Sequence, residues 1–368
     1  MLYRKYRPQT FAQVVGQDHV VKTLQGALET GRTGHAYLFC GPRGTGKTTM
    51  ARILAKALNC EKYEGIDERR RGNTEASRLN VPCGVCASCQ AITNGTSLDL
   101  IEIDAASQTG VDNIRELTDS AMVAASGGKH KIFLIDEVHM LSKSAFNALL
   151  KTLEEPPAHV MFILATTEPQ KILATVLSRV QRFDFRRLSN ADIVSKLKGI
   201  ASAEKFSIDD EALAAIAASA DGALRDAEVS LTKIRAMVPT GAITGKQVAQ
   251  ILGLIPSSYH PQFLSAILAG DKASAIALIH EIHDSGLDLE NFAKEFLVFT
   301  RKALLSRINP ATLVSIEGAG ADQKFAPFAT ADQRKLIKII NLFTAARSQV
   351  KTSPIPQLPL ELAVMEIE

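Results

Sequence analysis

Residues 36–48 read AYLFCGPRGTGKT, and this stretch decides the fold of the first half of the chain. Ala36–Cys40 is an apolar run with the length of a buried strand. The eight residues after it match the pattern G-x-x-x-x-G-K-[ST] at every position. Apolar residues then recur with the spacing of one helix face, at Met50, Ile53, Leu54, Ala57 and Leu58. A strand, a glycine-rich loop and a helix in this order predict part of a parallel α/β sheet.

The glycine-rich loop is suited to bind phosphate groups. Its glycines let the backbone wrap phosphate oxygens closely, and the following helix directs free N–H groups and its positive dipole end at them. Lys47 adds a positive charge near the β- and γ-phosphates, and the Thr48 hydroxyl can ligate magnesium. An unliganded glycine-rich turn is the alternative, but the flanking strand and helix favour a nucleoside triphosphate site. The predicted binding residues are Gly41, Pro42, Arg43, Gly44, Thr45, Gly46, Lys47, Thr48 and Thr49.

Two carboxylates follow a second apolar strand, Ile132–Ile135. Ligands of doubly wound sheets bind beyond the carboxyl ends of the strands, where Asp136 and Glu137 would lie. Asp136 is predicted to hold magnesium, and Glu137 to polarise an attacking water. A solvated acidic turn is the alternative for an isolated strand end. His139 could sense the phosphate state or serve only as a structural histidine.

Further apolar runs complete the predicted sheet at Leu98–Asp104, at Met161–Leu164 and, as an edge strand, at Phe183–Phe185. Strand signals end near Leu188, and the rest of the chain shows helical patterns. Helices are expected at Ala191–Lys205, Asp210–Ala220, Ala223–Val238 and Lys246–Leu252. The prolines, serines and glycine of Gly253–Pro261 predict a boundary. We therefore expect an α/β domain at 1–187, a small helical domain at 188–250 and a helical C-terminal domain at 251–368.

Cysteines form a second motif inside the first domain. Cys83, Cys86 and Cys89 have the spacing C-x₂-C-x₂-C, and Cys60 precedes them. Four thiolates suit a closed tetrahedral zinc site, with a role in structure or in subunit contact. An iron–sulfur cluster is the chemical alternative. Cys40 is expected to be a small buried apolar residue.

Composition limits the class of protein. The chain has 368 residues, 46% hydrophobic, with 42 basic and 39 acidic side chains, a net charge of +3 and five cysteines. This apolar content is enough for packed cores. The near balance of charge gives no basis for non-specific binding to nucleic acid, so any such contact would have to come from a local basic face. No apolar run is long enough to cross a bilayer, and the N-terminal residues lack the apolar core of a secretion signal. A soluble, cytoplasmic protein without disulfides is expected.

Longer motifs reveal a family resemblance. Asp136–Ser142 reads DEVHMLS, and Phe146–Pro157 reads FNALLKTLEEPP. Near the N-terminus, Tyr6–Phe11 reads YRPQTF and Val14–Gln17 reads VVGQ. These blocks resemble the clamp-loader branch of the AAA+ ATPases and, within it, the gamma and tau subunits of bacterial DNA polymerase III. The resemblance implies a RecA-like AAA+ sheet with an inserted zinc module at 60–89, a helical lid domain and a helical collar for oligomerisation.

The resemblance also implies roles for single residues. Thr166 or Thr167 corresponds to sensor 1, and the sequence does not say which; a β-branched pair at a strand end is the alternative. Arg179, in Leu177–Val180 (LSRV), is similar to an arginine that reaches the ATP of the neighbouring subunit. Arg225 is similar to the sensor-2 arginine. Surface arginines are the alternatives for both. By the same resemblance, the residues that contact adenine are Pro8, Val14 and Val15.

As a whole, the resemblance implies an ATP-driven subunit that opens a sliding clamp and loads it onto primer–template DNA. ATP, Mg²⁺ and Zn²⁺ are the expected cofactors. Delta-like and delta-prime-like subunits, further copies of the chain, the clamp and DNA are the expected partners, with phosphate contacts near Gln108 and the helix Asp112–Thr118. An ATP-binding scaffold without turnover and a branch-migration helicase are the alternatives. Tau forms carry further segments, and the sequence leaves open whether the native chain continues past Glu368.

Overall fold

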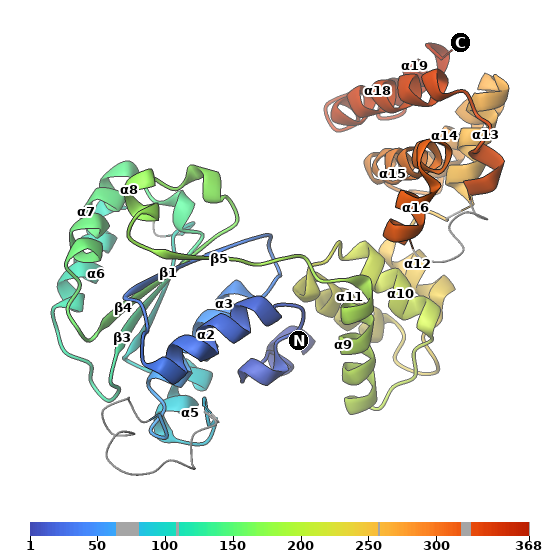
Figure 1. Cartoon of the computed structure of the whole chain (residues 1–368). Helices are drawn as coiled ribbons and strands as arrows, with labels where there is room; N and C mark the ends of the chain where they lie inside the picture. The colour runs from blue at the N-terminus through green and yellow to red at the C-terminus, as the bar shows by residue number, and fades with distance from the viewer. Residues whose placement is uncertain (64–80, 108–109, 257, 318–324, 368) are drawn as a thin grey trace. The chain divides into compact units, whose positions relative to one another are not determined.

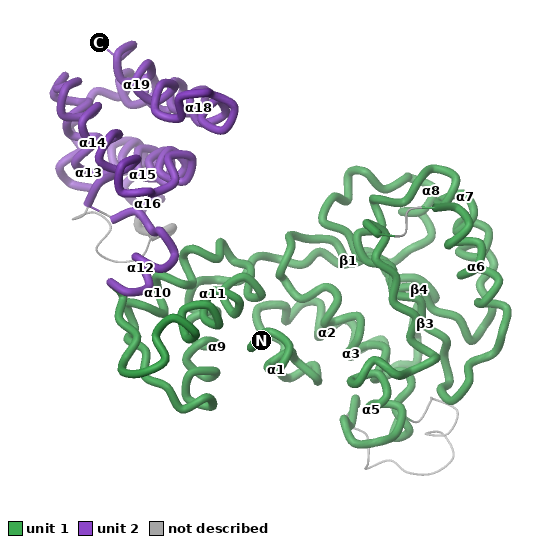
Figure 2. Tube along the Cα trace, turned by 180° about the vertical axis from the view of Figure 1, so that it is seen from behind, with its two compact units in different colours: residues 1–245 green, residues 246–368 purple. Residues whose placement is uncertain are grey.

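The computed structural model describes residues 1–63, 81–107, 110–256, 258–317 and 325–367. These residues form two compact units, Met1–Gly245 and Lys246–Glu368 (Figure 2). The first unit contains the predicted sheet and the helices that follow it. The finer division of the chain into three domains stays a prediction.

The sheet of the first unit has five parallel strands in the order β2-β3-β4-β1-β5. Each predicted strand is present, and β5 lies at the edge as expected. The loop of residues 41–46 follows β1, which is flanked by β4 and β5, so its ligand would lie beyond the carboxyl ends of central strands. The bounds are β1 (Ala36–Cys40), β2 (Leu100–Asp104), β3 (Lys131–Asp136), β4 (Val160–Thr166) and β5 (Gln181–Asp184).

Helices cover both faces of this sheet (Figure 1). Tyr37 and Phe39 of β1 pack with α2, α3 and α5 on one face, whereas Leu38 and Cys40 pack with α6 and α7 on the other. Burial on both faces explains why β1 and β4 are apolar along their whole length. The helices are α2 (Asp18–Thr30), α3 (Lys47–Leu58), α5 (Ala87–Asn94), α6 (Val111–Ala121), α7 (Lys143–Glu154) and α8 (Ala174–Leu177).

The first unit ends in three helices, α9 (Asn190–Ala203), α10 (Asp210–Ser219) and α11 (Leu224–Met237). All three were expected within two residues of these bounds. The short N-terminal helix α1 (Leu2–Lys5) packs on α11, where the Leu2 N–H donates to Thr232 Oγ1 at 3.4 Å. Lys5 and Tyr6 both bond the Glu204 carboxylate, at 2.6 and 2.7 Å. The N-terminal segment is therefore fixed to the helical part of this unit.

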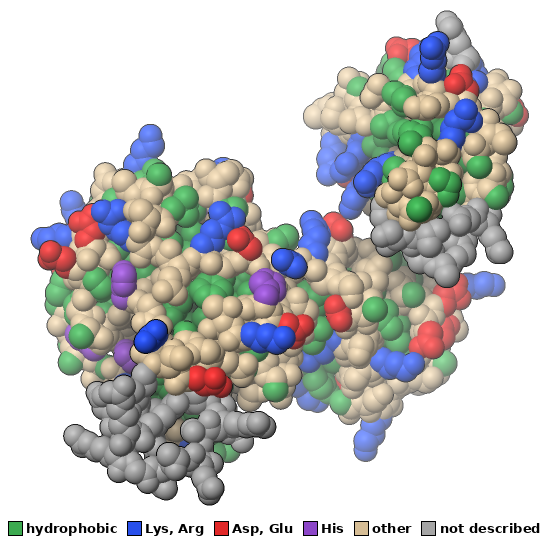
Figure 3. Space-filling view, viewed as in Figure 1, with side chains coloured by type: hydrophobic (Ala, Val, Ile, Leu, Met, Phe, Trp, Pro, Cys, Tyr) green, Lys and Arg blue, Asp and Glu red, His purple; other side chains and the backbone are tan. Residues whose placement is uncertain are grey.

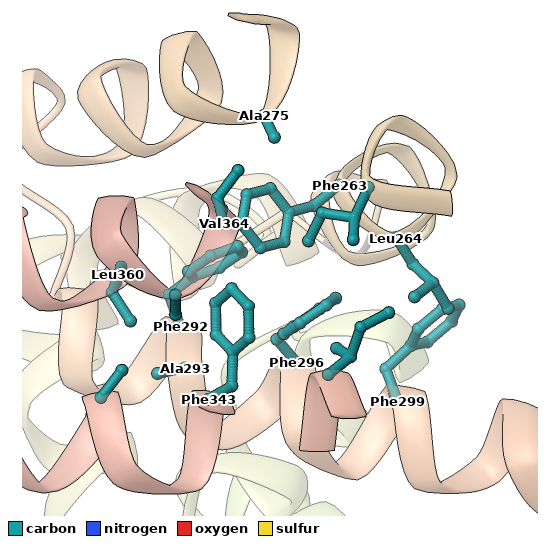
Figure 4. Close-up of a cluster of buried hydrophobic side chains, with 14 of the residues drawn as sticks. Phe263, Leu264, Ala275, Phe292, Ala293, Phe296, Phe299, Phe343, Leu360 and Val364 are labelled. Atoms are coloured by element: carbon teal, nitrogen blue, oxygen red, sulfur yellow. The ribbon is translucent and has the colours of Figure 1, made fainter. Parts of the chain in front are cut away.

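The second unit consists of helices around an aromatic core (Figure 4). Phe263 contacts Phe292, Phe296 and Phe343 edge to face, with ring centroids 4.8–5.6 Å apart. Its helices are α12 (Gly245–Leu252, which begins at the unit boundary), α13 (Tyr259–Ala269), α14 (Lys272–Asp284), α15 (Leu289–Ile308), α16 (Pro310–Glu317), α18 (Gln333–Val350) and α19 (Leu358–Met365).

Two details of this unit bear on the sequence predictions. The predicted connection Gly253–Pro261 is shorter than expected, because Pro261 lies in the first turn of α13, where a helix tolerates proline. A break at Asn309 separates α15 from α16. Among the helices described, none is both long and apolar enough to span a membrane.

Candidate nucleotide-binding site

The predicted phosphate loop opens into a cleft of about 550 Å³ in the first unit. Six segments that are far apart in the sequence line it: the N-terminal segment, the phosphate loop, the end of β2, the acidic end of β3, the chain after β5 and the start of α11. The lining residues are Tyr3, Arg7, Pro8, Val14, Val15, Arg43, Gly44, Thr45, Gly46, Lys47, Thr48, Thr49, Asp104, Ala106, Asp136, Glu137, Leu188, Leu224, Arg225 and Glu228.

Two glycines of the loop are required by close backbone contacts. A Cβ on Gly41 would lie 2.5 Å from the carbonyl oxygen of Phe185, and one on Gly44 would lie 2.9 Å from the Cβ of Ala223. Both residues also have positive φ values, +148° and +78°. The phosphate loop therefore touches both the chain that leaves β5 and the residue that precedes α11.

Lys47 begins α3 and lies beneath the loop. Its Nζ donates to the carbonyl oxygens of Gly41 and Pro42, at 2.7 and 2.9 Å. Burial lowers the pKa of this lysine, and the carboxylates of Glu137 and Asp136 oppose the shift. A bound triphosphate would supply further negative charge, so the position favours a charged ammonium group beside the phosphates.

The predicted magnesium ligands are in direct contact within the cleft lining. Thr48 Oγ1 donates to Asp136 Oδ2 at 2.7 Å, which joins the start of α3 to the end of β3. The other oxygen of Asp136 accepts from the Glu137 N–H at 2.9 Å. A hydroxyl and a carboxylate beside a phosphate loop are the oxygen ligands that Mg²⁺ uses with nucleotides, so these residues fit the ion.

Glu137 is held by the threonine pair at the end of β4. Its Oε2 accepts from Thr167 Oγ1 at 3.0 Å and from the Thr167 N–H at 3.3 Å. The hydroxyl of Thr166 instead lies 3.0 Å from His139 Nδ1 and accepts from the Glu168 N–H at 3.0 Å. The two hydroxyls therefore have different neighbours, and only that of Thr167 bonds the predicted water-polarising carboxylate.

His139 is nearly enclosed by this group. Its side chain is 6% exposed, with Nδ1 3.5 Å from Glu137 Oε2 and Nε2 3.4 Å from Glu168 Oε1. It links the end of β3 to the residues that follow β4. These contacts fit a histidine that senses the phosphate state and equally a histidine with a structural role.

The two predicted arginines lie in different places. Arg225 is part of the cleft lining, and its guanidinium lies 5.1 Å from the centroid of the Tyr3 ring. Arg179 lies outside this lining, where it pairs with Glu154 at 2.7 Å and donates to the Thr175 carbonyl oxygen at 2.7 Å. Its side chain remains 33% exposed. The fold thus joins Arg225, but not Arg179, to the cleft of its own chain.

The remaining lining shows which residues of the cleft the sequence reasoning missed. The three residues predicted to contact adenine, Pro8, Val14 and Val15, all line the cleft. Tyr3, Arg7, Asp104, Ala106, Leu188, Leu224 and Glu228 also line it and were not predicted. Glu228 lies three residues after Arg225 on α11, but a glutamate on a helix is usually solvated, so this spacing alone did not mark it. Arg7 lies in the YRPQTF block that carries the family resemblance, whereas no local pattern distinguished Tyr3 from other surface residues.

The four cysteines of the predicted metal site converge. The sulfur atoms of Cys60, Cys83, Cys86 and Cys89 all lie within 4.8 Å of one another. Burial raises the pKa of the Cys60 and Cys89 thiols, so a nearby cation is needed to keep these sulfurs as thiolates. Four convergent, mostly buried sulfurs fit Zn²⁺ in a closed structural site. The insertion between Cys60 and Cys83 includes residues 64–80, which lie outside the described residues.

The predicted DNA-contacting segment is only partly described. Helix α6 begins at Val111 with Gly110 at its N-cap, one residue before the expected start. Gln108 lies outside the described residues. Lys and Arg side chains are dispersed among acidic ones on the face drawn in Figure 3. A DNA contact therefore stays a prediction.

A parallel five-stranded sheet with a phosphate loop after β1, an acidic end on β3 and a helical lid is the fold of an AAA+ nucleotide-binding protein. Three family models match the chain in succession. They are "DNA polymerase III, delta subunit" over residues 16–189, "DNA polymerase III clamp loader subunit, ATPase lid domain" over 192–233, and "DNA polymerase III subunits gamma and tau domain III" over 243–367.

Curated relatives agree with these matches. The chain is 40% identical to DNA polymerase III subunit tau of Bacillus subtilis, over all of this chain and 62% of that protein. It is 43% identical to subunit tau of Escherichia coli, over 85% of this chain and 46% of that protein. It is 36% identical to subunit gamma of Buchnera aphidicola, over all of this chain and 98% of that protein. The chain belongs to the gamma/tau family of DNA polymerase III subunits.

The same comparisons also show how much of its relatives the chain spans and how far its likeness to solved structures extends. The chain spans about half to three fifths of the length of the tau proteins it matches. The Holliday junction branch migration motor RuvB of Thermotoga maritima is 19% identical, with a TM-score of 0.49 over 71% of this chain and 79% of that one. A likeness at that level carries no conclusion about function.

Proposed function

We propose that the chain is an ATPase motor subunit of a bacterial clamp loader, which uses ATP binding and hydrolysis at subunit interfaces to open a sliding clamp and load it onto primer–template DNA. Membership of the gamma/tau family supports this function. The observation that carries it is the cleft in which Lys47, Thr48, Asp136, Glu137 and Arg225 converge. The expected partners are delta-like and delta-prime-like subunits, further copies of the chain, the clamp and DNA, in the bacterial cytoplasm.

Within this proposal, each residue of the cleft has a distinct task. The phosphate loop and Lys47 bind the β- and γ-phosphates. Glu137 orients the attacking water, and its hydrogen bonds to Thr167 favour Thr167 over Thr166 as the sensor-1 residue. Thr48 and Asp136 would hold Mg²⁺, which supplies charge neutralisation at the phosphates when bound. Arg225 senses the terminal phosphate from the lid.

The nucleotide site is proposed to be completed by a neighbouring subunit. Arg179 lies outside its own cleft and is partly exposed, as an arginine that serves another chain must be. Positive charge from such a residue stabilises the loose transition state of phosphoryl transfer. ATP therefore joins adjacent subunits, and loss of the γ-phosphate weakens that junction. The zinc module and residues 251–368 are assigned structural and oligomerisation roles.

The test is ATP hydrolysis by the complex assembled from this chain, the other loader subunits, the clamp and primed DNA. We expect DNA and clamp to stimulate turnover, and Lys47→Ala to abolish it. Lys22→Ala, which removes an exposed lysine on α2, is the matched control and should behave like the unsubstituted chain. ATP binding without DNA-stimulated turnover would instead identify the chain as an ATP-binding scaffold.

A second assay separates clamp loading from branch migration. Labelled clamp should remain on primed circular DNA after incubation with the complex and ATP, and should not do so with Lys47→Ala. Unwinding of a four-way junction without clamp loading would contradict the proposed function.

A further inference from the structure

Helix α11 places a buried carboxyl group in the nucleotide cleft. Glu228 is only 5% exposed, yet it is one of the lining residues of the cleft. Its Oε1 atom is buried and has no hydrogen-bond partner among the residues that the structure describes. A buried acceptor without a partner costs free energy, so this group needs a donor that enters the cleft.

The position of Glu228 along α11 places it away from the phosphates. Ala223, just before the helix, is the residue against which Gly44 of the phosphate loop packs. Glu228 lies five residues further on, which is about 7 Å along a helix that rises about 1.5 Å per residue. Since Leu224, Arg225 and Glu228 lie on one helix face, the cleft continues along α11 from the phosphate loop toward Glu228.

The surroundings of this end of the cleft suit a purine ring. The apolar residues of the cleft lining are Pro8, Val14, Val15, Leu188 and Leu224, and none belongs to the phosphate loop. Such a surface packs against the flat faces of a base but offers no hydrogen bond to its edge. Glu228 adds an acceptor to this lining, and a few placed polar groups in an apolar pocket are what fix orientation and specificity.

The positive charges of Lys196 in α9 and of Arg7 in the N-terminal segment act on Glu228 and favour its ionised form. Burial nevertheless raises the pKa of Glu228 to about 7, because these cations only partly offset the loss of hydration. Whether protonated or ionised, the carboxyl group retains an oxygen that accepts a hydrogen bond. Adenine presents an amino donor at position 6, whereas guanine presents a carbonyl acceptor there.

We propose that Glu228 recognises the 6-amino group of the adenine ring and thereby sets the preference of this cleft for ATP over GTP. The inference rests on the proposed function only in requiring that the cleft holds a nucleoside triphosphate. Arg225 reads the phosphate end of the ligand from the same helix face on which Glu228 reads the base. One helix therefore responds to both the identity and the phosphorylation state of the nucleotide.

The test compares ATP with purine riboside triphosphate, which lacks only the 6-amino group, by calorimetric titration of the full chain. The unsubstituted chain should bind ATP about tenfold more tightly, the size expected for one buried hydrogen bond. Glu228→Leu should bind both triphosphates with similar affinity. Glu228→Gln, whose amide oxygen also accepts, should keep the preference. Asp226→Asn, at an exposed position of α11, is the matched control and should keep it as well.

The outcomes distinguish the two proposals. Equal affinities for the two triphosphates in the unsubstituted chain overturn the inference without the use of any variant. An unchanged preference in Glu228→Leu overturns it too, because the discrimination then comes from another group. The proposed function fails instead if the unsubstituted chain binds neither triphosphate. It also fails if Lys47→Ala binds the triphosphates as tightly as the unsubstituted chain does. GTP, measured in parallel, should bind more weakly than ATP to the unsubstituted chain and lose this disadvantage in Glu228→Leu.

Discussion

Replacement of Arg179 by alanine should separate stability from turnover. In its own chain Arg179 pairs with Glu154 at 2.7 Å, but the two side chains are 33% and 51% exposed. Solvent screens such a pair, so its loss should lower the free energy of unfolding by less than about 1 kcal/mol. ATP affinity of the isolated chain should not change, because Arg179 lies outside the cleft lining.

In the assembled complex the same substitution should have a far larger effect. An arginine that completes a neighbour's phosphate site contributes a factor of about 10³ or more to turnover. That factor corresponds to about 4 kcal/mol in the activation barrier, which exceeds the expected effect on folding several times over. Arg182→Ala is the matched control, since Arg182 is an exposed arginine of β5 that pairs with Asp184 at 2.7 Å. The Arg182→Ala variant should lose little folding stability, and the complex that contains it should keep its ATP turnover.

A mixing experiment asks whether the site is shared between chains. Lys47→Ala and Arg179→Ala should each be inactive when they supply all copies of this chain in the complex. When the two variants are mixed before assembly, some interfaces combine an intact Lys47 with a neighbour's intact Arg179, so part of the turnover should return. Undiminished turnover by Arg179→Ala alone, or no recovery on mixing, would refute the reasoning.

Three further perturbations test other parts of the first unit. Gly41→Ala should destabilise the chain by about 2–4 kcal/mol, because its Cβ would lie 2.5 Å from the Phe185 carbonyl oxygen. Gly46→Ala should destabilise it by only about 1–2 kcal/mol, because its strain comes from the positive φ alone. Similar melting temperatures for the two variants would contradict this. Elemental analysis of the purified chain should find one equivalent of zinc. Cys86→Ser or a chelator should remove this zinc and lower the melting temperature. Iron in place of zinc would contradict the assignment. Burial raises the pKa of Glu228 to about 7, so this group favours the folded state only while it is protonated. The free energy of unfolding of the ligand-free chain, measured against that of Glu228→Gln, should therefore fall by about 3 kcal/mol from pH 4.5 to pH 7. A difference between the two chains that does not change with pH in urea denaturation would contradict this.

The fold could be predicted because its strands are buried on both faces. An apolar run such as Ala36–Cys40 identifies a central strand without knowledge of its neighbours. Strand ends were less predictable, because pairing sets them. Strand β2 was expected to begin at Leu98, but it begins at Leu100, which pairs with Ile132 of β3. Leu98 lies outside this pairing and is 74% exposed.

Site residues were predictable to the extent that their chemistry is local in sequence. Lys47 and Asp136 are marked by short motifs whose context the sequence also supplies. The sequence does not distinguish Thr166 from Thr167, since adjacent residues of an extended chain point in opposite directions and either could face the nucleotide. The structure gives the two hydroxyls different neighbours, and Thr167 as the sensor-1 residue stays a proposal. Glu228 was missed because a glutamate on a helix is usually solvated, and only packing against distant segments buries this one.

These long-range contacts give the cleft a means to respond to nucleotide. The N-terminal segment is bonded to α9–α11 through Leu2, Lys5 and Tyr6, and its next residues line the cleft. A bound triphosphate would touch this segment, the phosphate loop and α11 together, so it favours the arrangement in which all three are close. Under the proposed function, hydrolysis leaves the base contacts unchanged and removes only those to the γ-phosphate. We then expect any movement of α11 to come from the difference in binding at Lys47 and Arg225, since a ligand shifts a conformational equilibrium only by its differential affinity.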